Sequence, residues 1–293
     1  MTVVVGYVVG KSGPAPLNLA AEVAAALATS LVVVTVVPKP WSTPSMARVD
    51  AEYAAWANTL AADSRAEAAA HLADHAPGLD VTYRQVSAGT SGEGLVEIAE
   101  ELGADALVVG SSSDGALGQV VLGTTTDWLL HSSPVPVAIS PRGYRGARGG
   151  RITRLTCAYS GSPNSVRVVE LVAELTAGRP VAMRVISFAI RGRTMFPPEV
   201  GLHAEDSILE VWANDLRSML AQLRSDGIVT GDVELQVITG NGWDQALDNT
   251  EWDDGELLML GTTGRRGIKG VFLGSHGAKI IRYSPVPVVV LPK

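Results

Sequence analysis

A glycine- and hydroxyl-rich segment near the carboxyl end of the chain has the residue types and spacing of an anion site. It reads Gly261-Thr-Thr-Gly264, then nine residues, then Gly274-Ser275, and an apolar run precedes it. Glycines let backbone N–H groups approach an anion closely, and the start of a helix adds unpaired donors and the positive end of its dipole. If a helix begins at Ser275, this spacing predicts a phosphate site between a strand and that helix.

Three cationic side chains lie in the same loop. Arg265, Arg266 and Lys269 fall between the glycine pairs, although the whole chain has a formal net charge of −7. Such side chains can form charge-assisted hydrogen bonds with a phosphate. The same glycines, with Ser275 as the cap of the helix, are also typical of a tight strand-to-helix turn that holds no ligand. We favour ligand binding for this segment, and the empty turn remains the alternative.

A second segment of this kind, Gly110-Ser-Ser-Ser113 followed by Gly123-Thr124, lacks several of these features. Ser113 replaces the second glycine, and the loop contains Asp114 but no Lys or Arg from residue 111 to residue 141. A carboxylate at a phosphate position weakens binding, by about 1 kcal/mol for one exposed charge. The sequence therefore predicts a degenerate or specialised first site, and here the empty turn is the favoured interpretation.

The two segments belong to an internal repeat. Shifting the chain by 151 residues aligns residues 110–142 with 261–293, and the pentapeptide Ser133–Val137 recurs as Ser284–Val288. A period near 150 residues is too long for a solenoid repeat and implies that a whole domain was duplicated. We therefore divide the chain into a first unit, residues 1–143, and a second unit, residues 152–293. The linker is the Arg- and Gly-rich segment Arg142–Arg151.

Apolar strand-like runs alternate with helical patterns in both units. Continuous apolar strands that alternate with helices are typical of parallel sheets covered on both faces. The expected fold is therefore α/β, with two tandem doubly wound five-stranded parallel sheets flanked by helices. The expected strands are Val3–Val9, Leu31–Val37, Val81–Val86, Ala106–Val109, Val135–Ile139, Leu155–Tyr159, Val181–Ser187, Val233–Ile238, Leu257–Leu260 and Val286–Leu291. The expected helices are Leu17–Thr29, Met46–His75, Gly94–Leu102, Thr124–His131, Val166–Ala177, Ala204–Ser225, Trp243–Asn249 and Ser275–Arg282.

The last apolar run of each unit contains a proline, Pro136 in the first unit and Pro287 in the second. Proline cannot donate to a strand ladder, so each run is expected at the edge of a sheet. An apolar edge invites pairing with a similar strand. We expect Val135–Ile139 and Val286–Leu291 to lie side by side as an internal pseudo-dimer, with a homodimer through the same strands as the alternative.

Composition argues against several other classes of protein. An acidic chain without a basic face is a poor partner for nucleic acid. Apolar runs such as Leu31–Val37 are too short to span a bilayer, and no cationic segment precedes the apolar start, so we expect a cytoplasmic protein without a membrane partner. The five His residues and Cys157 show no metal-ligand or catalytic spacing, and Cys157 is expected to be a small buried residue.

The spacing Gly-x2-Gly-x9-Gly-Ser, followed by a helix and the apolar run after Ser284, resembles the universal stress protein family in its tandem two-domain form. The resemblance covers essentially the whole chain. It implies an adenine nucleotide alpha hydrolase-like fold with Rossmann-like strand order 3-2-1-4-5, dimerisation through the last strand, and a role in stress sensing. In some members it also implies bound ATP or AMP, with Mg²⁺ only alongside ATP. The nucleotide-binding residues implied for the second unit are Gly261, Gly264, Gly274, Ser275, Ser160, Arg265 and Lys269, and their degenerate counterparts in the first unit are Gly110, Ser113, Gly123 and Thr124.

The chain departs from the family at the adenine subsite. ATP-binding members carry an aspartate just after the first strand, where Val8 and Ser160 stand here. Two other functions therefore stay open. One is a nucleotide-free dimeric signalling scaffold. The other is an ATP pyrophosphatase, because Ser160-Gly-Ser-Pro-Asn-Ser165 loosely resembles the Ser-Gly-Gly-x-Asp-Ser loop of those enzymes. Further catalytic residues for that reaction are not found, so we expect a sensor with at most weak nucleotide hydrolysis.

Overall fold

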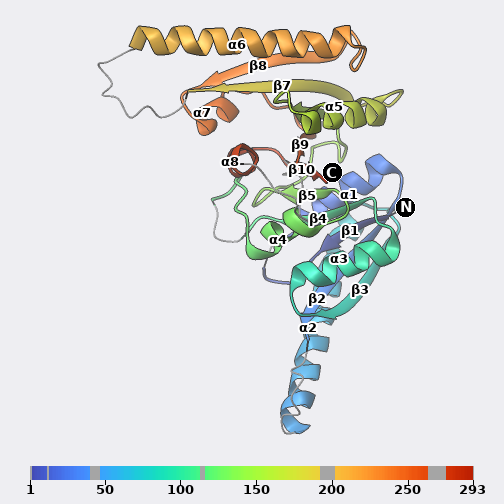
Figure 1. Cartoon of the computed structure of the whole chain (residues 1–293). Helices are drawn as coiled ribbons and strands as arrows, with labels where there is room; N and C mark the ends of the chain where they lie inside the picture. Colours follow the sequence, from blue (N-terminus) through green and yellow to red (C-terminus); the bar gives the residue numbers. More distant parts are fainter. Residues whose placement is uncertain are drawn as a thin grey trace.

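The computed structural model describes residues 2–11, 13–39, 47–112, 116–191, 202–262 and 275–292. Within these ranges the expected strands and helices are all found (Figure 1). The first unit consists of β1 (Thr2–Gly6), α1 (Ala15–Leu27), β2 (Ser30–Pro38), α2 (Ala47–His75), β3 (Val81–Ala88), α3 (Ser91–Leu102), β4 (Ala106–Gly110), α4 (Thr124–Ser132) and β5 (Val137–Ser140). The second consists of β6 (Arg154–Ala158), α5 (Pro163–Thr176), β7 (Ala182–Ile190), α6 (Leu202–Ser225), β8 (Glu234–Gly240), α7 (Trp243–Asp248), β9 (Glu256–Gly261), α8 (Ser275–Tyr283) and β10 (Val288–Leu291).

The strand order confirms the expected fold in each unit. The five strands of each unit are parallel and their first strand is central, in the orders β3-β2-β1-β4-β5 and β8-β7-β6-β9-β10. The two sheets are not separate, however, because β5 and β10 pair in antiparallel register and join them into one ten-stranded sheet. The two expected five-stranded parallel sheets are thus present as the two halves of one mixed sheet. The predicted contact between the last strands is confirmed, and it is what makes the sheet continuous.

The two prolines precede these strands rather than lying inside them. Pro136 and Pro287 have no N–H to offer, but their carbonyl groups accept hydrogen bonds from Leu107 at 2.8 Å and Leu258 at 3.0 Å. Each proline therefore bonds, through its carbonyl group, to the neighbouring strand of its own unit. The register at the junction pairs Ala138 with Val289.

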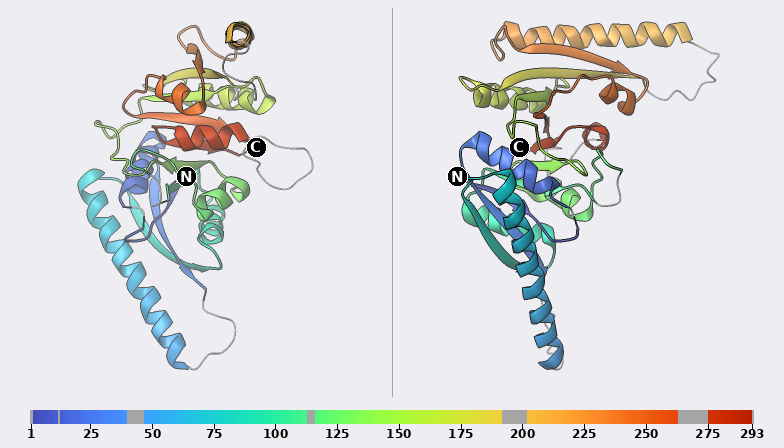
Figure 2. Two further views of the ribbon diagram at one scale, coloured as in Figure 1. Left: turned by 90° about the vertical axis from the view of Figure 1, so that its left-hand side faces the viewer. Right: turned by 180° about the vertical axis from the view of Figure 1, so that it is seen from behind.

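Apolar side chains cover both faces of the joined sheet. Successive residues of a strand point to opposite faces, so Ala138 and Val289 belong to the core layer beneath α1 and α5. Val137 and Val288 belong to the opposite layer, which also contains residues from α3, α4 and α8. Each layer includes residues of both units, so the two cores merge across the junction. Figure 2 shows the second unit, in yellow to red, continuing from the first along the sheet.

The linker is packed against both units. The carboxylate of Glu22 in α1, only 4% exposed, accepts hydrogen bonds from the Tyr144 hydroxyl at 2.7 Å and from the Ala147 N–H at 2.5 Å. The Arg148 N–H donates to Asp254 of the second unit at 2.9 Å. Gly146 has φ +84°, and a Cβ there would lie 3.0 Å from a Glu22 oxygen, so this turn requires glycine. The linker is therefore a fixed connection between the units.

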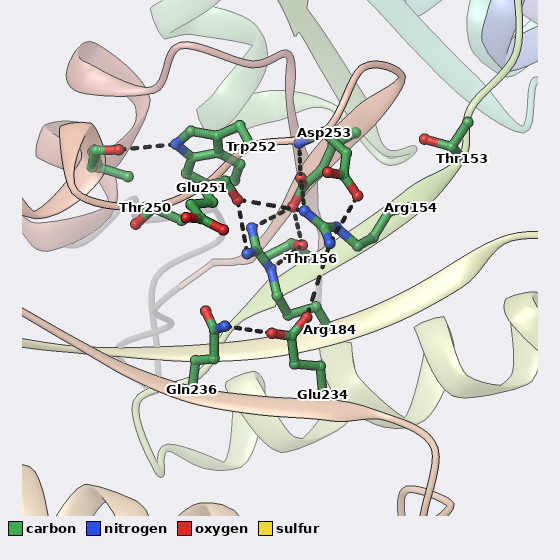
Figure 3. A network of polar contacts seen from close by, with 12 residues as sticks. Thr153, Arg154, Thr156, Arg184, Glu234, Gln236, Thr250, Glu251, Trp252 and Asp253 are labelled. Atoms are coloured by element: carbon green, nitrogen blue, oxygen red, sulfur yellow. Dashed lines mark hydrogen bonds and ion pairs between the residues drawn. The ribbon is translucent and has the colours of Figure 1, made fainter.

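A buried ionic network lies on the strands of the second unit (Figure 3). Arg184 of β7 is 2% exposed and donates to Glu256 at 2.6 Å, to the Thr156 hydroxyl at 3.1 Å and to the Glu251 carbonyl at 2.9 Å. Arg154 binds the other oxygen of Glu256 at 2.7 Å. Thr156 and Arg184 are paired in register, as Val4 and Val32 are in the first unit. The same positions are thus apolar in one unit and ionic in the other.

Replacement of Arg184 by Val should lower the free energy of unfolding by about 3–5 kcal/mol, because Glu256 would then lose its fully buried charged partner. Arg184→Val with Glu256→Leu should recover much of that loss, since no uncompensated carboxylate remains at the buried site. Urea unfolding of both variants measures the two values.

The matched control is Arg84→Val, because Arg84 of β3 pairs with Glu101 at 2.9 Å in a largely exposed ion pair. The free energy of unfolding should fall by about 1 kcal/mol or less in Arg84→Val. If Arg84→Val and Arg184→Val destabilise the protein equally, burial is not what makes the network matter.

The Glu22 contact with the linker predicts a pH dependence. Burial raises the pKa of Glu22, and Asp254 adds to the rise, while the hydrogen bonds from Tyr144 and Ala147 lower it in part. A carboxyl group whose folded pKa is raised contributes stability below its unfolded pKa of about 4.3, and this contribution is lost as the pH rises through the folded pKa. Relative to Glu22→Gln, the native chain should therefore be most stable near pH 4 and lose that advantage toward pH 7. Urea unfolding of both proteins across this range tests it, and a pH-independent difference would contradict it.

Candidate functional site

The loops after β6 and β9 meet at one edge of the second unit. β6 and β9 are parallel neighbours, so their carboxyl ends share that edge, which is where ligands bind in open parallel sheets. Ser160 follows β6 by two residues, Gly261 is the last residue of β9, and Ser275 begins α8. The Asn164 side chain in the first turn of α5 donates a hydrogen bond to the carbonyl of Thr262. This bond ties the two loops together.

Gly261 has a packing role in this arrangement. A Cβ at this position would lie 2.9 Å from Cγ2 of Val168 and 3.2 Å from the carbonyl oxygen of Asn164. A side chain there would push α5 away from β9. The glycine is therefore explained by helix–strand packing, whether or not a ligand approaches it.

Three serine hydroxyls gather at the start of α5. The Ser160 hydroxyl lies 3.0 Å from that of Ser162 and 3.4 Å from that of Ser165, and Ser162 caps the helix by accepting from the Ser165 N–H at 3.3 Å. Gly161 between them has φ +72°, a left-handed conformation that favours glycine. A hydroxyl can both donate and accept, so this group offers hydrogen bonds to an anion or a sugar but no negative charge for the adenine subsite.

The remaining expected residues of the second site, Gly264, Arg265, Lys269 and Gly274, lie outside the described residues, as does the side chain of Ser275. Two residues at this edge were missed by the sequence analysis, Asn164 and Thr262. Thr262 is buried, and its hydroxyl has no hydrogen-bond partner within the described part of the chain. Both residues lie in segments that the sequence marks, Asn164 in the serine-rich segment after β6 and Thr262 within Gly261-Thr-Thr-Gly264, but only the fold shows that they bond to each other.

The corresponding loop of the first unit is closed on itself. Gly110 ends β4, the Ser112 N–H donates to the Val121 carbonyl at 2.9 Å, and the Val121 N–H donates to the Ser111 hydroxyl at 2.8 Å. The Ser111 N–H donates to Ser140 at 3.0 Å. The first two amides after β4 are thus used within the protein.

The other end of that loop leads into α4. Thr124 begins the helix, and Gly123 precedes it with no side-chain cap. Among the residues that the structure describes, a Cβ on Gly123 would meet Ser112 at 3.6 Å, which is ordinary contact. Ser113 lies outside the described residues.

Side chains of α2 close over the chain after β1. The Val9 N–H donates to the Ser64 hydroxyl at 3.1 Å, and the Tyr7 hydroxyl donates to Glu67 at 2.5 Å. Burial raises the pKa of Tyr7, and the Glu67 carboxylate adds to the rise. Val8, at the position of the family's aspartate, is therefore next to residues that are already paired with α2.

Metal, thiol and membrane chemistry have little support in the described residues. Among the described residues no group of three or more His, Cys, Asp or Glu side chains is placed to hold a metal ion. Cys157 is fully buried, and burial raises the pKa of its thiol. None of the helices in the described ranges is long and apolar enough to cross a membrane.

Comparison with known proteins gives the family. The universal stress protein family model matches residues 1–141 and 151–292. Universal stress proteins of Mycobacterium bovis and Mycobacterium tuberculosis are each 54% identical to the chain over 292 residues, which is the full length of both partners. The match to a crystal structure of a universal stress protein from Archaeoglobus fulgidus covers 99% of this chain and 98% of the Archaeoglobus chain, with 18% identity and a TM-score of 0.63.

Two smaller solved relatives contain nucleotides. A universal stress protein in complex with cAMP matches 49% of this chain, with 24% identity and a TM-score of 0.36. One from Archaeoglobus fulgidus in complex with dAMP matches 48% of this chain, with 19% identity and a TM-score of 0.33. Because the family model covers both halves of the sequence, the chain belongs to the universal stress protein family and carries two of its domains in tandem.

Proposed function

We propose that this protein is a stress-response sensor that binds an adenine nucleotide, ATP or AMP, at the edge formed by the loops after β6 and β9. The observation that carries the proposal is the junction of these two loops through Asn164 and Thr262. It sets the serine hydroxyls after β6 and the end of β9 at one edge, and from there the chain runs on to the glycines and cations before α8. Mg²⁺ would accompany ATP only.

The difference between the two units supports the choice of the second. In the first unit the amides of Ser111 and Ser112 are used by neighbouring backbone carbonyls, and Asp114 would oppose a phosphate. In the second unit the equivalent loop carries Gly264 with Arg265 and Lys269. A phosphate favours a loop that is rich in glycine and positive charge over one that carries a carboxylate.

One observation favours a nucleotide-free scaffold as the second candidate. Gly261, the first glycine of the motif, has a full explanation in the packing of α5, so its presence alone does not require a ligand. Nucleotide retained through purification, detected by absorbance and mass spectrometry, distinguishes a sensor from a scaffold.

Calorimetric titration with ATP tests the site assignment. Gly274→Val should abolish binding, because the side chain blocks the approach of a phosphate to the backbone at the start of α8, and charge-assisted bonds to such amides contribute about 1.5–3 kcal/mol each. Lys269→Ala removes one exposed cation and should weaken binding by no more than about fivefold, since such a contact contributes about 0–1 kcal/mol. The salt dependence of the affinity should also become flatter.

The matched control is Gly123→Val at the equivalent position of the first unit. A Cβ at Gly123 makes only ordinary contact with the described residues, so we expect this variant to fold and to bind ATP as the native protein does. Unchanged affinity in Gly274→Val, or loss of binding in Gly123→Val alone, would place the nucleotide in the first unit instead. No measurable ATP or AMP binding by the native protein would favour the scaffold.

A further inference from the structure

A groove of about 560 Å³ lies beside α1 of the first unit. Its walls come from α1, from the end of α2 with the turn that follows it, and from the linker. Sites for small molecules commonly have volumes of about 300–1,000 Å³. The linker occurs once in the chain, so the repeat does not generate a second copy of this groove.

Two arginines of the linker, Arg145 and Arg148, line the groove. Arg145 and Arg148 are exposed, and neither side chain forms an ion pair with any residue that the structure describes. The Arg148 backbone is held by Asp254, which fixes this part of the linker in place. Two unpaired guanidinium groups on an acidic protein form a favourable place for a phosphate or carboxylate, whose oxygens match their planar donors.

Two carboxylates, those of Glu22 and Asp74, also line the groove. Both oxygens of Glu22 already accept hydrogen bonds, one from Tyr144 and the other from Ala147. Asp74 is exposed at the end of α2, next to His75. Neither carboxylate lies within 4.0 Å of a guanidinium nitrogen of Arg145 or Arg148.

The other walls of the groove combine polar and apolar side chains. Asn18 and Glu22 of α1 and Asp74 and His75 of α2 line it together with Ala21, Ala25, Pro77 and Leu79. A ligand with an anionic head and an apolar body could use both the arginines and the apolar side chains. A bare inorganic ion would leave the apolar side chains in water.

We propose that this groove binds a small organic anion, with its phosphate or carboxylate on Arg145 and Arg148 and its apolar body against Ala25 and Leu79. This site is separate from the nucleotide site proposed above and does not depend on it. Because the linker is bonded both to Glu22 of the first unit and to Asp254 of the second, an occupant would contact the segment that connects them.

Titration of the full chain with phenyl phosphate, followed by the amide NMR signals of Gly146, Gly149 and Gly150, tests the proposal. These signals should shift in a saturable way. Inorganic phosphate should bind at least tenfold more weakly, because it lacks the apolar body. Benzoate should shift the same signals, as the carboxylate arm of the test.

Three variants make the test specific. The double variant R145S/R148S should weaken phenyl phosphate binding at least tenfold, and Ala25→Glu should do the same by placing a carboxylate on the apolar wall. Arg151→Ser is the matched control, since Arg151 is an exposed arginine of the same linker that does not line the groove, and it should bind within about twofold of the native chain. Gly274→Val should leave the linker shifts unchanged, which separates this site from the nucleotide site.

Three results would overturn the proposal. The first is a set of shifts confined to residues outside the linker, α1 and α2. The second is an equal loss of affinity in R145S/R148S and Arg151→Ser, which would indicate unspecific attraction to positive charge. The third is an equal affinity for phenyl phosphate and inorganic phosphate, which would leave the apolar walls without a role.

Discussion

The antiparallel pairing of β5 with β10 is the constraint on which the rest of the structure depends. It covers the apolar edge of each unit with the other and makes both core layers continuous across ten strands. It also reverses the strands of the second unit, so the carboxyl end of β5 and the amino end of β6 share one edge of the sheet. Only β10 and β9 lie between them, about 14 Å in all at the usual strand spacing. A short, fixed linker can therefore span the gap, and the loop after β4 lies at the opposite edge from the loop after β9 that we propose binds the nucleotide.

The segment before β9 connects this junction to the ionic network. The Glu251 carbonyl and the Glu256 carboxylate accept hydrogen bonds from Arg184. Asp254, between them in the sequence, accepts one from the Arg148 N–H of the linker. Buried ion pairs contribute little net stability, because each charge must first be removed from water. Their effect is geometric, since Arg184 can satisfy its donors only when β6, β7 and the segment before β9 are all in place. The first unit, with Val4 and Val32 at the paired positions, has no such requirement and contacts the linker through Glu22 instead.

Much of the fold could be predicted from the sequence because it follows from local patterns. Apolar runs gave the strands, the 151-residue period gave two units, and Pro136 and Pro287 indicated the paired edges. The buried charges could not be predicted in this way. Arg184 stands in an otherwise apolar strand and its partner Glu256 lies 72 residues later, so only the tertiary fold brings them together. Glu22, in an alanine-rich helix, has the pattern of a solvated residue until the linker covers it.

The candidate site was less predictable, because a glycine can be required either by close packing or by the approach of a ligand. At Gly261 the backbone lies close to the carbonyl oxygen of Asn164 and to the side chain of Val168, which leaves no room for a Cβ. A phosphate would require the same absence of a side chain, so spacing alone does not distinguish the two explanations. A glycine that no helix crowds is more informative. Among the described residues Gly123 is such a position, since a Cβ there would make only ordinary contact with Ser112. A glycine directly before the helix therefore separates the two explanations better than Gly261 does, and our proposal for the second unit is tested at Gly274 rather than at Gly261.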